Sequence, residues 1–446
     1  MKLSRWGQLD SSLSVRFVLP VIWENTLTIV VGLLFSRVIS GISASALAAI
    51  GMSNTVMTVA FAVFSMVTTG ASVLVSRHIG AQESREAANT VEQTILLSLV
   101  SSSVVTLLCF AAASPILRLL MPTAEDQLFS EAVRYFRILV LSLPLYVLHS
   151  ALSTICRSMG DSKNPLIVAL FMNVVQLIAG YVLIAQAGLE EIGAGLAYIV
   201  CRIVGSGLML WTLTHNQKYF VLQLKNVLRP RMATITRILR IGIPVSIESI
   251  FVQVGYMLGN SMSIALGTFE AGVYQVMNTL NTFMTIGQPI CAAIALSAVG
   301  HMLGAKRITD AKKGGMFIWY MGIAATVLLG SIVLIWAAPL CGLYSSDPAT
   351  VSSASGIMWI LLVMDIAGIS INAIDPQLRA GGDVKYVMII TLTAVWLIRL
   401  PLTWLFSFHF DMGVMGIFLA NTISLYYRAI LGLVRHRGNR WIKKKI

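Results

Sequence analysis

The chain has 446 residues, of which 57% are hydrophobic and only 11% charged, and its formal net charge is +13. So small a charged fraction excludes a soluble globular protein, because a soluble domain needs far more polar surface to face water. The five cysteines are scattered through apolar stretches without a CxxC pair, which argues against a disulfide framework or a cysteine zinc site.

Apolar stretches recur from end to end, each near the ~20 residues that a helix needs to cross a membrane. Helices are expected because lipid cannot satisfy exposed backbone groups. The first stretch lacks a small-residue cleavage site, so we interpret it as a span rather than a signal peptide. We predict an all-α polytopic membrane protein with twelve transmembrane helices, near 16–40, 47–75, 91–121, 136–158, 164–187, 192–215, 240–266, 272–303, 314–343, 353–379, 385–408 and 413–434.

Lys and Arg gather in alternate loops, and short basic loops stay in the cytoplasm, so both termini are predicted to be cytoplasmic. We therefore attribute the net charge of +13 to this topology signal, with anionic lipid headgroups as the expected partners, and not to nucleic-acid binding. The predicted domains are an N-terminal six-helix lobe 1–215, a basic cytoplasmic linker 216–239, a C-terminal six-helix lobe 240–434 and a basic cytoplasmic tail 435–446.

The two halves of the chain carry an internal repeat. Glu24 matches Glu248 at an offset of 248 − 24 = 224, and Arg157 matches Arg379 at 379 − 157 = 222. Six spans separate the matching elements, an even number, so the two halves have the same orientation in the membrane. Parallel repeats of this kind are typical of transporters in which one bundle rocks against the other about a site near the midplane.

The chain contains several short segments in a characteristic order: LPVIWEN at 19–25, SALAAIGMSN at 45–54, RSMGDSKNP at 157–165, RIGIPVSIES at 240–249, GVYQVMN at 272–278 and LRAGGDVKY at 378–386. With these segments the chain resembles, over essentially its whole length, the multidrug and toxic compound extrusion (MATE) family of bacterial antiporters. The resemblance implies a V-shaped pair of six-helix lobes that exports organic, often cationic, compounds in exchange for H⁺ or Na⁺.

The chain departs from this family at several acidic positions. Where many members have an aspartate in the first span, this sequence has Phe35, and it has Gly180 where some have a carboxylate in the fifth span. Val252 and Gly368 stand where acids of the seventh and tenth spans would fall. The family's coupling residues are therefore not carried over, and both H⁺ and Na⁺ stay open as the coupling ion.

Ionisable side chains inside a span cost at least ~2.5–3.5 kcal/mol on insertion scales, so each is a functional candidate. A rise of ~1.5 Å per residue puts Asp365 and Arg399 at one depth, about 21 Å from the cytoplasmic end of their spans, so we expect them to pair. Glu24 and Arg202 are expected to meet in the N-terminal lobe, whereas Glu248 has no evident partner at its depth. Because Glu248 also occurs in the repeat, it has the best claim to coupling. These five residues are the candidates for ion or proton coupling, and Na⁺, if it is the coupling ion, would bind at their carboxylates. The alternative for the two pairs, permanent ion pairs that only brace helices, stays open.

Polar, aromatic and methionine side chains within the spans suit a cleft for varied apolar ligands, since thioethers adapt their shape. The alternative for each is ordinary packing or hydrogen bonding between helices. The resemblance favours two of them, Gln275 and Asn278. The full set of cleft candidates is Gln275, Asn278, Asn54, Tyr274, Tyr256, Phe35 and Met277.

We predict a secondary active transporter that exports small amphiphilic, cationic organic compounds or drugs in exchange for H⁺ or Na⁺ by alternating access. The alternative is a flippase for a lipid-linked or amphipathic substrate. An enzyme is disfavoured because HExxH, GxSxG and GxxxxGK motifs are lacking, and a channel because rings of charge are lacking. We expect no cofactor besides the coupling ion. The protein is expected to be a monomer in the cytoplasmic (inner) membrane of a bacterium, in contact with lipids and a small-molecule substrate.

Overall fold

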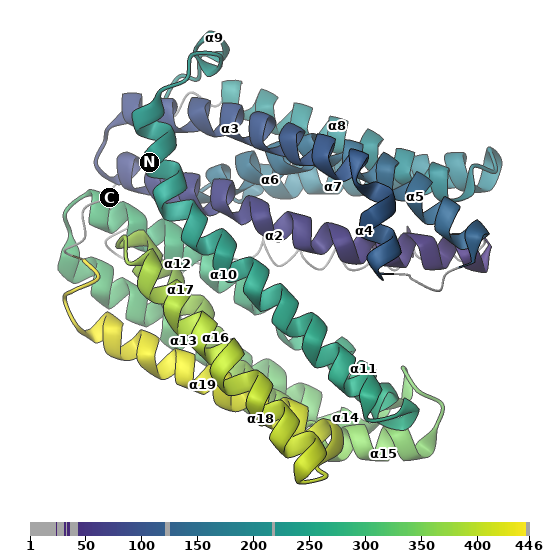
Figure 1. The fold of residues 1–446 in the computed structure, drawn as a ribbon. Coiled ribbons are helices and arrows are strands. Elements are labelled where there is room, and N and C mark those ends of the chain that lie inside the picture. Colours follow the sequence, from purple (N-terminus) through teal and green to yellow (C-terminus); the bar gives the residue numbers. More distant parts are fainter. Residues whose placement is uncertain are drawn as a thin grey trace. The chain divides into compact units, whose positions relative to one another are not determined.

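The computed structural model describes residues 43–120, 125–215 and 219–442, and before them only Glu24, Val31, Gly32, Leu34 and Phe35. Within these residues every regular element is a helix (Figure 1). The chain forms two compact units, and the boundary between them falls within one helix, after Ser246. We call the residues up to Ser246 the first unit and those from Ile247 the second unit. The domain boundaries expected from the sequence stay a prediction.

The first unit is a bundle in which α2 packs against α3, α5 and α6, and α8 packs against α5, α6 and α7. A bend of 43° separates α5 from α6. Pro144 stands in the first turn of α6 and has no backbone N–H to continue the preceding helix. The elements are α2 (Ala44–Gly80), α3 (Ser84–Ala111), α4 (Ala113–Leu120), α5 (Asp126–Leu141), α6 (Leu143–Ser158), α7 (Lys163–Gly180), η2 (Tyr181–Gln186), α8 (Glu190–His215), α9 (Leu224–Val227) and the start of α10 (Met232–Ala265).

The second unit is organised around α16, which packs against α12, α13 and α19 (Figure 1). In both units the label η denotes a π-helical segment. The elements are the rest of α10, then α11 (Thr268–Met284), α12 (Gly287–Gly304), α13 (Ile308–Ile335), α14 (Ala337–Gly342), α15 (Pro348–Ile357), α16 (Trp359–Ala380), α17 (Val384–Leu392), η3 (Thr393–Arg399), α18 (Leu400–Trp404), η4 (Leu405–His409) and α19 (Gly413–Arg437).

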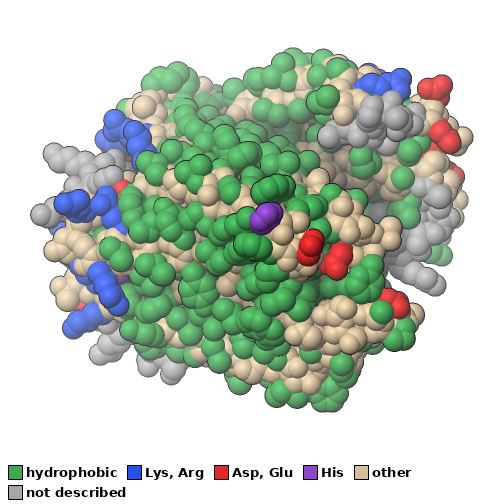
Figure 2. Space-filling model, turned by 60° about the horizontal axis from the view of Figure 1, so that its bottom comes forward, with side chains coloured by type: hydrophobic (Ala, Val, Ile, Leu, Met, Phe, Trp, Pro, Cys, Tyr) green, Lys and Arg blue, Asp and Glu red, His purple; other side chains and the backbone are tan. Residues whose placement is uncertain are grey.

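Ten helical segments are long and apolar enough to cross a membrane, and the bent α5–α6 pair makes eleven. They correspond to the second to twelfth predicted spans; the first, 16–40, lies largely outside the described residues, and the terminal lysines Lys443–Lys445 lie wholly outside them. Large apolar side chains face outward, such as Leu107, which is 71% exposed, and Ile335, which is 79% exposed. Hydrophobic side chains predominate on the face in Figure 2. Because such a surface is stable only in lipid, the predicted all-α polytopic membrane fold is confirmed.

The repeat extends to the backbone conformation of matching turns. Gln82 and Lys306, at the offset 306 − 82 = 224, have φ values of 63° and 60°. Gly160 and Gly382, at 382 − 160 = 222, have φ values of 82° and 91°. Each of these residues lies in the short turn after a helix, where a left-handed residue ends the helical hydrogen-bond pattern. The two halves therefore repeat in structure as well as in sequence.

The start of α10 approaches α2 closely within the first unit. A Cβ added at Gly242 would lie 1.9 Å from the backbone oxygen of Met66, and one added at Gly70 would lie 2.4 Å from that of Ile238. Nearby, the Ser246 hydroxyl donates to the backbone oxygen of Val63 at 2.9 Å. Small residues thus let the two backbones pack together, as is common between membrane helices.

Part of each unit is also covered by chain that follows one of its long helices. After α8, Phe220 and Leu222 are buried in a cluster that includes residues of α3 and α6. After α19, Trp441 is fully buried, and a Cβ at Gly381 would lie 2.4 Å from its ring. Trp441 and Tyr219, the neighbour of Phe220, are separated by 441 − 219 = 222, which is again the repeat offset. The described part of the predicted linker therefore packs on the first unit.

Candidate functional site

Asp365 on α16 is a buried carboxylate, 2% exposed, that is held by amides. The Asn281 amide donates to its two oxygens at 3.2 and 3.3 Å, and the Gln288 amide donates to Oδ1 at 3.3 Å. Asn281 and Gln288 lie on either side of the short break between α11 and α12. Gly368 makes room for this arrangement, because a Cβ there would lie 2.6 Å from Gln288 Nε2.

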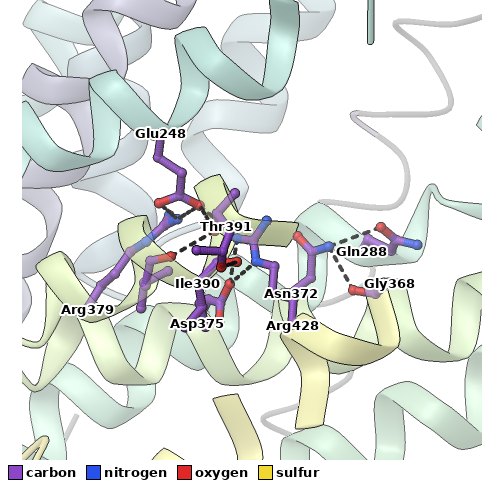
Figure 3. Close-up of polar contacts among 11 residues, drawn as sticks. Glu248, Gln288, Gly368, Asn372, Asp375, Arg379, Ile390, Thr391 and Arg428 are labelled. Atoms are coloured by element: carbon purple, nitrogen blue, oxygen red, sulfur yellow. Dashed lines mark hydrogen bonds and ion pairs between the residues drawn. The ribbon is translucent and has the colours of Figure 1, made fainter. Parts of the chain in front are cut away.

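The amide chain continues from Gln288 to Asn372, which lies two turns after Asp365 on α16. Asn372 Nδ2 donates to Gln288 Oε1 at 3.0 Å and to the backbone oxygen of Gly368 at 2.9 Å (Figure 3). Gln288 is thus held at both ends of its amide group. Both Asn281 and Gln288 present N–H donors to Asp365. The carboxylate thus accepts hydrogen bonds from neutral amides, which do not compensate its charge.

These residues border a cavity in the second unit of about 160 Å³, which we call the α16 cavity. Its polar lining includes five amide side chains, those of Asn278, Asn281, Gln288, Asn372 and Asn421. Its charged lining consists of Asp365, Arg399 and Arg428, and its rings include those of Tyr256, Tyr274 and Phe418. Polar groups that converge on one concave space in a membrane protein are the features of a binding site.

Arg399 does not pair with Asp365, so the expectation drawn from their equal depths is wrong. Arg399 lies on the π-helical segment η3 and is 4% exposed, and its guanidinium carbon sits 4.4 Å from the ring centre of Tyr256. Within the described residues neither Arg399 nor Asp365 belongs to an ion pair. Equal depth along two helices does not determine which way their side chains face, and here both border the cavity without bonding to each other.

Glu248 has partners, contrary to expectation. Its two carboxylate oxygens accept from Arg379 Nη2 at 2.9 Å each, and Oε1 also accepts from Thr391 at 2.9 Å and from Arg428 Nη2 at 2.7 Å (Figure 3). Arg428 in turn donates to Asp375 at 2.6 and 2.9 Å. Depth counts along Cα atoms missed this group because long guanidinium side chains extend well away from their own backbone position.

This charge cluster, made of Glu248, Asp375, Arg379 and Arg428 with the hydroxyl of Thr391, contains two acids and two bases. The charges balance, and the members come from α10, α16, α17 and α19. Removal of one member of such a buried, bonded cluster leaves an uncompensated charge and is costly, so the cluster ties these four helices together. Arg428 belongs to both sites, because it also borders the α16 cavity.

In the first unit, Glu24 pairs with Arg157 and not with Arg202, so that expected pair is also wrong. The Arg202 guanidinium lies 4.6 Å from the ring centre of Tyr146. The Glu24–Arg157 pair is the repeat counterpart of Glu248–Arg379, since both of its members match by offset. The offsets of 224 and 222 match these residues between the halves, although they do not show that the members of each pair bond to each other.

The predicted cleft residues divide between the two units. Asn278, Tyr274 and Tyr256 border the α16 cavity, whereas Gln275 does not, and Met277 is fully buried in an apolar cluster. Phe35 and Asn54 belong to the first unit.

Phe35 is 3% exposed and packs on the backbone at Gly180, where a Cβ would lie 2.5 Å from its ring. Both positions are among those at which the chain departs from the family's acids. The aromatic ring therefore fills the space above the glycine.

Comparisons with known proteins agree with this architecture. The family model MatE matches residues 20–182 and 244–405, two stretches whose starts are one repeat apart, 244 − 20 = 224. The probable multidrug resistance protein NorM of Thermotoga maritima is 23% identical over 445 residues, covering 97% of this chain and 93% of the relative. The uncharacterized transporter YisQ of Bacillus subtilis is 25% identical over 432 residues, covering 95% and 94%.

Among solved structures, an outward-facing multidrug resistance MATE family transporter of the MOP superfamily has a TM-score of 0.89 at 18% sequence identity. The match covers 98% of this chain and 97% of that one. A MOP superfamily transporter from Pyrococcus furiosus has a TM-score of 0.87, also at 18% identity, and the match covers 100% of this chain and 99% of that one. At this identity the likeness concerns the fold, and it agrees with the predicted architecture of two six-helix lobes.

Proposed function

Since the chain belongs to the MATE family of transporters, we propose that it exports small organic compounds in exchange for protons, with Asp365 as the coupling carboxylate. The proposal places it as a monomer in the cytoplasmic membrane of a bacterium, with both termini in the cytoplasm. One relative is named an uncharacterized transporter and another a probable multidrug resistance protein.

The observation that carries the proposal is the environment of Asp365. It is the one carboxylate that borders the α16 cavity, and it has amide partners but no ion pair within the described part of the chain. A proton and a positively charged occupant of the cavity would each neutralise it, so the two would compete for the same group. Such competition is what an exchanger requires, because binding of one must release the other.

The groups that surround Asp365 favour H⁺ over Na⁺. Hard cations take oxygen ligands, whereas Asn281 and Gln288 turn N–H donors toward the carboxylate. Glu248, the other acidic candidate of this unit, is neutralised within the charge cluster and is assigned a bracing role. The flippase alternative is less well supported, because a pyrophosphate headgroup would need a strongly cationic cavity and this one contains an acid.

The test is efflux of ethidium from proteoliposomes that contain the full-length protein, under separately imposed pH and Na⁺ gradients. We expect the pH gradient to drive efflux, Asp365→Asn to abolish that drive, and the exposed-site control Asp310→Asn to leave it unchanged. Efflux driven only by Na⁺ would refute the choice of ion, and undiminished pH-driven efflux by Asp365→Asn would refute the choice of residue. If neither gradient drives efflux, the exchange mechanism is wrong.

A further inference from the structure

We infer that the α16 cavity binds a small zwitterion of amino-acid size, with its cationic group at Asp365 and its anionic group at Arg399. This inference rests on the proposed function, because it names the class of compound that would compete with the proton at Asp365. It adds a requirement that a cation exporter does not have, namely a negative group on the same compound.

The first argument is the state of Arg399. Its side chain is 4% exposed and borders the cavity, yet it forms no ion pair and no hydrogen bond within the residues that the structure describes. A guanidinium has five N–H donors, and its cation–π contact with Tyr256 satisfies none of them. A desolvated cation–π contact contributes ~2 kcal/mol, less than the ~2.5–3.5 kcal/mol that an arginine costs at a span centre. The described residues therefore supply no anionic partner for Arg399, and an anionic group of a ligand would supply one.

The second cation of the cavity wall does not need such a partner. Arg428 donates to Glu248 and to Asp375, so its charge is compensated by the charge cluster (Figure 3). The uncompensated charges of the cavity are accordingly one positive, at Arg399, and one negative, at Asp365. A purely cationic or purely anionic occupant leaves one of them without a counterion, whereas a zwitterion provides for both.

The remaining lining suits a polar body between the two charges. The Asn278 side chain forms no hydrogen bond within the described residues, and Asn421 donates only to the sulfur of Met364, a weak acceptor, at 3.1 Å. Both amides are thus available to a ligand. The volume of about 160 Å³ is below the ~300–1,000 Å³ of sites for drug-sized molecules. The occupant is therefore a compound, or the end of a compound, of amino-acid size.

The probes are two matched series on fixed hydrocarbon bodies. One comprises leucine, isopentylamine and 4-methylpentanoate, and the other phenylalanine, phenethylamine and 3-phenylpropionate. Each series compares a zwitterion with the amine and the acid that lack one of its charges. Binding is measured by the rise in the thermal unfolding midpoint of the full-length protein, since a ligand that binds the folded state stabilises it. We expect at least one zwitterion to bind about 10- to 100-fold more tightly than its amine and its acid, as loss of a charge-assisted hydrogen bond implies.

Variants identify the two contacts. Arg399→Gln should reduce binding of the zwitterion to the level of the amine without weakening the amine, which also shows that the cavity is intact. Arg399→Lys should restore much of the difference. Asp365→Asn should reduce binding of the zwitterion to the level of the acid. The matched control is Arg118→Gln, which removes an arginine that lies 4.2 Å from the ring centre of Phe129 in the first unit; it should change nothing.

The inference is overturned if in both series the amine or the acid binds as tightly as the zwitterion, if Arg399→Gln weakens all three probes of a series equally, or if no probe stabilises the protein at millimolar concentration. Proton-driven ethidium efflux is measured on the same preparations. If ethidium efflux is proton-driven but one of these outcomes is found, the inference of a zwitterion is wrong and the proposed function is still supported. Zwitterion binding that depends on both residues, without export of that zwitterion or of ethidium under either gradient, would refute the exchange mechanism instead.

Discussion

Replacing Glu248 by glutamine removes the acid that the two arginines of the charge cluster share. Arg379 donates both of its hydrogen bonds within the cluster to Glu248, at 2.9 Å each. Arg428 would still be paired with Asp375 in the variant. The variant therefore leaves one largely buried guanidinium, 18% exposed, without an acidic partner. Removal of one partner from a buried ion pair costs about 3–5 kcal/mol. We expect the free energy of unfolding to fall by that amount.

The measurement is unfolding of the purified protein in mixed micelles by a denaturing detergent, followed by tryptophan fluorescence. The double variant Glu248→Gln with Arg379→Gln removes one charge of each sign, so it should be less damaging than the sum of the single changes, with a coupling energy of about 2–3 kcal/mol. Asp310→Asn, from an ion pair whose side chains are 40% and 41% exposed, should cost at most about 1 kcal/mol. Equal losses for Glu248→Gln and Asp310→Asn, or additive losses in the double variant, would refute the assignment of a bracing cluster.

Two further changes test the packing of the units. Trp441→Ala empties the fully buried site beside Gly381 and should lower stability by about 3–5 kcal/mol; an unchanged midpoint in thermal unfolding would show that the tail does not cover the second unit. Gly242→Ala should destabilise by about 1–3 kcal/mol, because its Cβ would lie 1.9 Å from a backbone oxygen. Gly207→Ala, with nothing within 4 Å of its Cβ, should instead be neutral or slightly stabilising by its helix propensity, so the same sign for both glycines would contradict the close contact.

The positions of the candidate charges could be identified from sequence, but their partners could not. Asp365, Arg399 and Glu248 stand out because ionisable groups are rare in apolar spans. Their pairing depends on the rotation of each helix about its own axis and on the reach of long side chains, and a count of residues along the chain contains neither. Arg379 shows the difficulty, since its position near the end of a span concealed its contact with Glu248.

The amides around Asp365 illustrate a second limit. Asn281 and Gln288 are seven positions apart (288 − 281 = 7) and would lie two turns apart on a continuous helix. The break between α11 and α12 brings both onto the same carboxylate. Asn372 and Asn421 gave no signal in the sequence, because asparagine within a span is equally suited to a contact between helices.

The sequence by itself determined that the chain crosses a membrane many times and that its halves repeat in parallel, because hydrophobic length and residue offsets are properties of the chain alone. Those offsets also matched the members of the ion pairs Glu24–Arg157 and Glu248–Arg379 between the halves, although they did not show that the members bond to each other. Only the tertiary structure decided that Arg399 and Asp365 border one cavity without bonding to each other. The reason is physical: equal depth in the membrane is set by position along a helix, whereas contact is set by which faces of neighbouring helices meet.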